Sequence, residues 1–334
     1  MATVTINFVI VAIFYFGGNA IGAGEMAIGD ITAVTEYAIW ILFYVMMAQM
    51  TILMLPRALA SLRRVFAVLH QEPEIVDGGK SFAGDPMAPV MELDDVSFRF
   101  ADADEETLSH LTFACRRGET AAIIGGTGSG KSTVARLLLR EHDVTAGAIR
   151  LYGQDIREFR QETLRSRIAY VPQKAWLFSG TIADNLRYAA SEASEEEMRR
   201  ALQVAQADFV FTLPKGLLTQ VAQGGTNFSG GQRQRLAIAR ALMKKADLFV
   251  FDDSFSALDF KTDAALRQAL KKELRSAAVL IITQRVSTIQ KADSILVLNE
   301  GRIAGTGRHE ELLQNCSVYR DIVMSQEKGG ELNE

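Results

Sequence analysis

The chain has 334 residues, of which 48% are hydrophobic, and its formal net charge is −4. That length suffices for one large or two modest domains with a core. The mild acidity, without any basic stripe or tail, argues against a nucleic-acid partner. The two cysteines, Cys115 and Cys316, are far apart and lack metal-ligand spacing, which predicts reduced thiols.

Two apolar runs, 6–23 and 31–55, open the chain, and each is long enough to cross a hydrocarbon core of ~30 Å. The first basic residue is Arg57, and Arg63 and Arg64 follow it. By the positive-inside rule this end lies in the cytoplasm, so two crossings place the N-terminus there as well. We therefore expect a two-helix, all-α transmembrane segment in the cell membrane, inner or plasma. A cleaved signal peptide or a buried hairpin is the alternative, but a second long run follows at once.

Helical apolar spacing continues beyond residue 55, which predicts that the second helix extends into the cytoplasm. It should end near Pro73, because proline blocks helix continuation. The predicted organisation is therefore membrane helices over 1–72, a Gly- and Pro-rich linker over 73–90, a nucleotide-binding domain over 91–326 and a flexible tail over 327–334.

The long C-terminal part alternates short β-rich runs with helical stretches, a pattern typical of an α/β domain with a largely parallel sheet. The expected strands are 120–124, 149–152, 168–171, 248–251, 279–283 and 295–298. The charged stretches 155–167 and 191–200 are interpreted as solvated faces of a helical subdomain.

A glycine-rich segment follows the strand predicted at 120–124 and opens a helix. In this context the GxxxxGK[ST] pattern indicates a P-loop NTPase, whose backbone N–H groups surround phosphate. The predicted ATP-binding residues here are Gly125, Gly126, Thr127, Gly128, Ser129, Gly130, Lys131, Ser132 and Thr133. Lys131 should reach the β- and γ-phosphates of ATP, and the Ser132 hydroxyl should bind Mg²⁺.

An acidic residue lies at the end of the strand predicted at 248–251. Asp252 is placed to hold Mg²⁺ through water, since a carboxylate at the end of a buried strand suits that role. The alternative is that Asp252 caps the following helix.

About a hundred residues after the glycine-rich segment comes Phe228-Ser229-Gly230-Gly231-Gln232. With both motifs, the whole chain resembles the C-terminal part of an ABC exporter half-transporter. The resemblance implies that Ser229, Gly230, Gly231 and Gln232 form the signature that contacts ATP held by a partner chain. It also implies that Gln173 is the Q-loop ligand of Mg²⁺ or water, and that Asp259 belongs to the D-loop.

The resemblance further suggests Phe100 as the aromatic residue that stacks on adenine. Because Val96, Phe98 and Phe100 alternate as one face of a strand, an ordinary core role is the alternative.

At two positions the chain departs from this family's pattern. Asp253 stands where the family has a catalytic glutamate, and its carboxylate is set back by roughly 1.5 Å, enough to lose a hydrogen bond to the attacking water. Gln284 stands where the family has a histidine, and an amide carries no positive charge. Gln223 also replaces a usual glutamate. Asp253 and Gln284 are therefore predicted to be degenerate catalytic positions.

The resulting hypothesis is an ABC-type transporter ATPase that binds MgATP, hydrolyses it poorly and pairs with a second, unlike half-transporter in the lipid bilayer to move an unidentified substrate. The alternatives are a homodimeric exporter with tolerated variants and a membrane-tethered nucleotide-binding fragment without transport. The resemblance implies six membrane helices, so we expect the reading frame to continue upstream; the alternative is that a separate upstream gene encodes the other four helices.

Overall fold

The computed structural model describes residues 2–331, with side chains over 4–327. The chain divides between Pro73 and Glu74 into two compact units, which are described separately.

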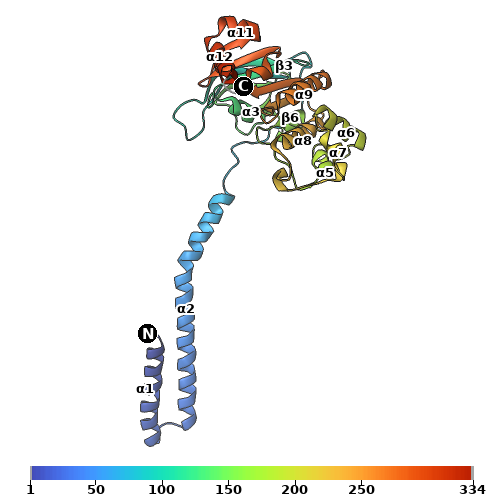
Figure 1. Ribbon diagram of the computed structural model, residues 1–334. Coiled ribbons are helices and arrows are strands. Elements are labelled where there is room, and N and C mark those ends of the chain that lie inside the picture. Colours follow the sequence, from blue (N-terminus) through green and yellow to red (C-terminus); the bar gives the residue numbers. More distant parts are fainter. Residues whose placement is uncertain (1, 332–334) are drawn as a thin grey trace. The chain divides into compact units, whose positions relative to one another are not determined.

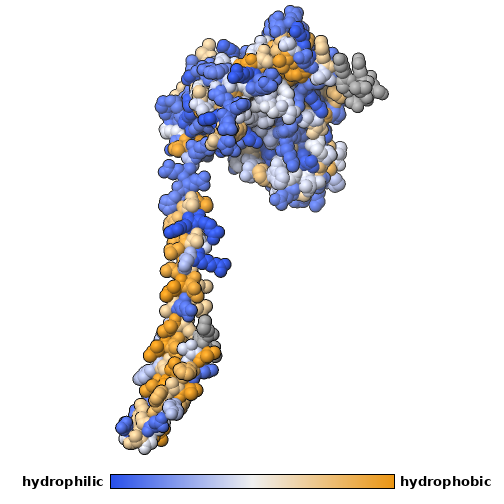
Figure 2. Space-filling view, turned by 90° about the vertical axis from the view of Figure 1, so that its left-hand side faces the viewer, coloured by the Kyte–Doolittle hydropathy of each residue, from blue (hydrophilic) through white to orange (hydrophobic). Residues whose placement is uncertain are grey.

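The N-terminal unit is a pair of helices, α1 (Ala2–Gly22) and α2 (Ile28–Leu69) (Figure 1). They touch where a Cβ on Gly17 would lie 2.9 Å from the Ile31 side chain, so glycine permits the close approach. Most of their other described side chains are exposed and apolar, as Figure 2 shows. Both helices are long and apolar enough to cross a membrane by length and composition. The second helix continues through Pro56, as predicted, and ends four residues before Pro73.

The C-terminal unit is built on a six-stranded sheet in the order β12-β11-β3-β10-β9-β6. The five strands from β11 to β6 are parallel and only β12 runs antiparallel, which confirms a largely parallel sheet. The strands are β3 (Thr120–Gly125), β6 (Ile168–Val171), β9 (Leu248–Asp252), β10 (Ala278–Thr283), β11 (Ser294–Asn299) and β12 (Arg302–Gly307).

A second, four-stranded antiparallel sheet has the order β2-β1-β4-β5. Its strands are β1 (Met91–Phe98), β2 (Leu108–Cys115), β4 (Ala146–Leu151) and β5 (Gln154–Asp155). The strand expected at 149–152 belongs here rather than to the parallel sheet. An apolar run of that length indicates a strand but does not reveal which strand it pairs with.

The helical subdomain consists of α5 (Ile182–Arg187), α6 (Glu195–Val204), α7 (Phe209–Thr212), α8 (Gly230–Leu242), the short helices η2 (Gly216–Leu218) and η3 (Gln223–Gly225), and the strand pair β7 (Gly180–Thr181) and β8 (Gln220–Val221). The stretch 191–200 is part of it and solvated, with Met198 as its fully buried residue. The interpretation of 155–167 was wrong. That stretch forms β5, η1 (Ile156–Glu158) and α4 (Gln161–Arg167), and its apolar residues Ile156, Phe159 and Leu164 are buried beside the antiparallel sheet.

The remaining helices are α3 (Lys131–Leu138), α9 (Phe260–Glu273), α10 (Val286–Ile289), α11 (His309–Asn315) and α12 (Ser317–Glu331). Helix α12 runs through the first part of the predicted tail, whose end at 332–334 lies outside the described residues. Along β3, Ala122 and Ile124 enter one core cluster, whereas Ala121 and Ile123 enter the other. The parallel sheet is therefore covered on both faces, and in such sheets ligands bind outside the carboxyl ends of the strands.

Candidate functional site

The glycine-rich loop joins the end of β3 to the start of α3. Gly130, the residue before the helix, has φ 99°, and a Cβ there would lie 2.5 Å from Leu108 Cδ2. A Cβ on Gly125 would lie 2.1 Å from the Leu298 carbonyl oxygen. Glycine is therefore required at both ends of the loop, which leads directly into the N-terminus of α3. This arrangement suits an anion.

Lys131, the first residue of α3, is buried beneath this loop. Its Nζ donates to the carbonyl oxygens of Gly125 at 2.9 Å and Gly126 at 2.6 Å, and to Ser129 Oγ at 3.3 Å. Burial lowers the pKa of the Lys131 ammonium, and the nearby carboxylates of residues 253 and 252 oppose that shift. The loop thus contains a cation held by carbonyls, which anionic oxygens can replace.

Asp252 ends β9, with its side chain 6% exposed. The Tyr170 hydroxyl donates to Asp252 Oδ2 at 3.1 Å. Burial raises the pKa of the Asp252 carboxyl, whereas the bond from Tyr170 works in the opposite direction. A partly desolvated carboxylate of this kind gains from a cation close by.

The Asp253 carboxylate is hydrogen-bonded through both of its oxygens. Gln173 Nε2 donates to Oδ2 at 3.1 Å, and Thr283 Oγ1 donates to Oδ1 at 3.3 Å. The backbone of Asp253 lies in the left-handed region, at φ 45°, and its N–H donates to the Ile282 carbonyl at 2.7 Å. Asp253 is therefore oriented from two sides, and Gln173 connects it to the loop after β6.

A cavity of about 330 Å³ joins these groups at the ends of the parallel strands. Its lining residues are Thr107, Thr127, Gly128, Gly130, Lys131, Ser132, Thr133, Gln173, Asp252, Asp253, Ile282, Thr283 and Gln284. Most of these were predicted site residues, and residues 125, 126 and 129 belong to the same loop. Thr107, Ile282, Thr283 and the Tyr170 hydroxyl were missed. Thr283 directly precedes the predicted Gln284, and Tyr170 is close in sequence to the predicted Gln173, whereas nothing in the sequence marks Thr107.

Two hydrogen bonds from the C-terminal helix hold the backbone beside Gln284. Gln326 of α12 donates through Nε2 to the Gln284 carbonyl at 2.6 Å, and its Oε1 accepts from the Val286 N–H at 2.9 Å. The Gln284 side chain itself is exposed at the cavity wall. Sequence reasoning missed Gln326, because about forty residues separate it from the loop it holds.

The predicted signature, residues 229–232, lies outside the cavity lining. Ser229 caps α8: its Oγ accepts from the Gln232 N–H at 3.3 Å, and Gln232 Oε1 accepts from the Ser229 N–H at 2.9 Å. A Cβ on Gly231 would lie 3.2 Å from the Ala257 carbonyl, so this helix start borders the turn that leads to Asp259. Asp259 caps α9 by accepting from Thr262 N–H at 2.9 Å. Ser229 to Gln232 and Asp259 are not among the residues that line the cavity.

Phe100 lies just beyond the end of β1 and is likewise not among the lining residues. Its ring meets Phe98 edge-on, with centroids 4.7 Å apart, and His142 at 5.4 Å. It is partly buried against the core around the antiparallel sheet. In this structure it is half-buried, and its contacts are those of a core residue.

Strand, glycine loop and helix at the edge of a covered parallel sheet define the C-terminal unit as a P-loop NTPase. Residues 108–256 match the family described as ABC transporter. The chain therefore carries the ATP-binding domain of the ABC transporter family and is homologous to exporter half-transporters.

Three relatives show the extent of this homology. An uncharacterised ABC transporter ATP-binding protein of Mycobacterium tuberculosis is 44% identical over 98% of this chain and 56% of its own length. An ATP-dependent lipid A-core flippase of Vibrio vulnificus is 39% identical over 80% of this chain and 46% of its own. The structure of a bacterial Atm1-family ABC exporter with ATP bound has a TM-score of 0.85 and 32% identity, covering 97% of this chain and 57% of that one. The chain spans about half the length of the curated relatives it matches.

Proposed function

We propose that this chain is the ATP-binding subunit of an ABC exporter, which couples binding and hydrolysis of MgATP to movement of a substrate across a membrane. One observation carries the proposal: a single cavity at the strand ends gathers Lys131, Ser132, Gln173 and Asp252. Helices α1 and α2 would lie in the bilayer, in the inner or plasma membrane, because their apolar side chains are exposed over membrane-spanning lengths. The C-terminal unit would then face the cytoplasm.

ATP fits the loop by charge and by backbone. The triphosphate would take the N–H groups of residues 125–133, and the Lys131 ammonium would exchange the carbonyls of Gly125 and Gly126 for phosphate oxygens. Phe100, which is half-buried, would stack on adenine.

The donor set beside the loop also fits Mg²⁺. The Ser132 hydroxyl, the Asp252 carboxylate and the amide oxygen of Gln173 line one cavity, and Mg²⁺ prefers oxygen ligands. The amide nitrogen of Gln173 is engaged with Asp253, which leaves its oxygen as the ligand atom. When bound with ATP, the cation supplies charge neutralisation to the phosphates.

The residues of this cavity favour the prediction that hydrolysis is slow. The Asp253 carboxylate accepts bonds from Gln173 and Thr283, so both oxygens already have partners, and it is one methylene shorter than glutamate. Gln284 can donate a hydrogen bond to a γ-phosphate but brings no charge. General-base assistance is worth ~10²–10⁴ in rate, so its loss would leave slow turnover.

An intact signature away from the cavity favours an unlike partner. At the start of α8, Ser229 and Gly230 are exposed, and Gly231 lies beside the turn that leads to Asp259. This surface would complete an ATP site whose phosphate loop and catalytic glutamate belong to a second half-transporter. The chain would thus contribute one weak site of its own and one competent site shared with its partner.

The test uses the full chain in lipid nanodiscs. A fluorescent ATP analogue measures binding, and phosphate release measures turnover. We expect tight Mg²⁺-dependent binding, slow release, and little further loss in Asp253→Asn. Adding a catalytically competent half-transporter should restore release, and Ser229→Ala in this chain should reduce it.

Three results would contradict the proposal. Brisk release by the chain alone, abolished by Asp253→Asn, would favour a homodimeric exporter. Nucleotide binding without any effect of a partner would favour a membrane-tethered nucleotide-binding protein. Failure to bind ATP at all would remove the ATPase assignment for this site.

A further inference from the structure

Residues 76–85, near the start of the C-terminal unit, lie against the segment around Phe159 and are called the strap. Two strap N–H groups bond to one backbone stretch: Gly78 donates to the Phe159 carbonyl at 2.9 Å and Lys80 to the Glu158 carbonyl at 3.1 Å. The Lys80 ammonium also pairs with the Glu158 carboxylate at 2.7 Å. The strap is therefore seated in register on the segment before α4.

The contact between the strap and the segment around Phe159 requires glycine at position 78. A Cβ on Gly78 would lie 2.1 Å from the Glu158 carbonyl carbon and oxygen, so any side chain there would lift the strap. Further along, the Phe82 ring stacks on Phe159 with ring centroids 5.6 Å apart. The guanidinium of Arg167 lies 3.6 Å from the centroid of the Phe82 ring. These contacts exceed what a flexible tether needs.

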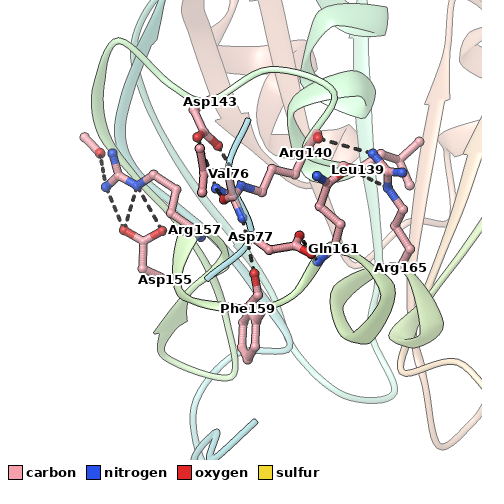
Figure 3. Close-up of polar contacts among 11 residues, drawn as sticks. Val76, Asp77, Leu139, Arg140, Asp143, Asp155, Arg157, Phe159, Gln161 and Arg165 are labelled. Carbon is pink, nitrogen blue, oxygen red and sulfur yellow. Dashed lines mark hydrogen bonds and ion pairs between the residues drawn. The ribbon is translucent and has the colours of Figure 1, made fainter. Parts of the chain in front are cut away.

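A buried arginine ties the strap to the end of the phosphate-loop helix. Arg140 follows α3 closely, has φ 50° and is 3% exposed. Its guanidinium donates to both carboxylate oxygens of Asp143 at 2.8 and 3.2 Å, to the Phe159 carbonyl at 3.2 Å and to the Val76 carbonyl at 2.8 Å (Figure 3). The strap thus supplies one acceptor of a buried cation, and losing it would leave a desolvated donor unpaired.

A second contact leads toward the other side of the cavity. Asp77 Oδ1 accepts from the Gln161 N–H, in the first turn of α4, at 2.9 Å, and Arg165 of the same helix donates to the Leu139 carbonyl at 3.1 Å (Figure 3). Helix α4 runs directly into β6, after which the chain reaches Gln173. The strap therefore contacts Arg140, just beyond the helix that begins at Lys131, and α4, which leads through β6 to Gln173.

We propose that the strap is a coupling element, seated through Arg140 as a positioning residue, and that its seating and nucleotide binding strengthen each other. The proposal rests on the proposed function, because it requires the cavity to bind ATP. Coupling between two sites is reciprocal, so a change that unseats the strap must weaken ATP binding by the factor by which ATP seats it. Since the strap continues into α2, it gives the cavity a connection to the predicted membrane segment through the chain itself.

Adjacent glycines offer a matched test. Gly78→Ala should unseat the strap, whereas a Cβ on Gly79 would meet nothing within 4 Å, so Gly79→Ala is the control. Two quantities are measured on the full chain in nanodiscs: the Kd of the fluorescent ATP analogue, and trypsin cleavage after Lys80. We expect Gly78→Ala to raise the Kd at least about fivefold, the lower end of typical coupling, and to speed cleavage. ATP should slow cleavage in the wild type and in Gly79→Ala.

Each outcome decides the matter. Faster cleavage in Gly78→Ala with unchanged ATP affinity would make the strap a mere tether, and unchanged cleavage would contradict the seat itself. If Gly78→Ala does not fold, Asp77→Ala removes only the acceptor for the Gln161 N–H and should shift both quantities in the same direction. Arg140→Lys should retain more ATP-dependent protection than Arg140→Gln. A wild type that fails to bind ATP overturns the proposed function, whereas binding without ATP-dependent protection overturns only this inference.

Discussion

Two walls of one cavity differ in what they require of the sequence. The phosphate-loop wall is built from backbone, and glycines at 125 and 130 are required because neighbouring atoms leave no room for a Cβ. The opposite wall, at Asp253 and Gln284, relies on side chains whose length and charge determine what they can do. Under the proposed function, Asp253 and Gln284 would weaken hydrolysis without disturbing the glycine loop or Lys131. The prediction is a site that keeps nucleotide binding while it loses hydrolysis.

The largest expected effect would restore the second wall. Asp253→Glu together with Gln284→His should raise phosphate release by the full chain by ~10²-fold or more, the lower end of general-base assistance. The longer carboxylate reaches ~1.5 Å further from the same backbone, and a histidine can carry charge. Release is measured at saturating ATP in nanodiscs, with ATP affinity as the control that should stay nearly constant. No gain in turnover would contradict the assignment of Asp253 and Gln284 as degenerate catalytic positions.

The next effect would break the first wall. Gly130→Ala should weaken binding of the ATP analogue at least about tenfold, because alanine is strained at φ 99° and its Cβ would meet Leu108. Gly79→Ala is the control, since it lies outside the cavity lining and a Cβ there meets nothing within 4 Å. Equal affinities for the two variants would contradict the claim that this wall depends on glycine geometry.

The same contrast explains how far sequence reasoning reached. The strands of the parallel sheet were predictable because buried parallel strands are continuous apolar runs, and the loop was predictable because its spacing is local. The antiparallel sheet, by comparison, was not recognised, since the sequence of a short strand does not show which strand it pairs with. Asp253 and Gln284 stood out only as departures from the pattern of the family that the chain resembles. The bonds that orient Asp253 come from Gln173 and Thr283, and distant pairings of this kind leave no periodic signal.

Residues 155–167 show where the prediction of burial from sequence failed. Their charges suggested a solvated face, yet Ile156, Phe159 and Leu164 are buried and support the strap. Sparse apolar residues without a regular period are the hardest to place, because the burial of each is decided by tertiary neighbours.

The smallest expected effect concerns how the second wall is held. Gln326 bonds to the backbone at Gln284 and Val286, and a typical hydrogen bond contributes about 1 kcal/mol, or roughly fivefold in an equilibrium. Gln326→Ala should therefore speed hydrogen exchange of the Val286 amide by about fivefold or more. Glu327→Ala, on the same exposed part of α12, is the control.

Because the effect is local, exchange in the phosphate loop should stay the same and ATP affinity should change little. The two walls would then also differ in what holds them in place. The phosphate loop would be fixed by its own glycines, and the loop at Gln284 by the C-terminal helix. Unchanged exchange at Val286 would mean that the loop holds its conformation without α12. In that case the C-terminal helix could be altered freely without affecting the position of Gln284.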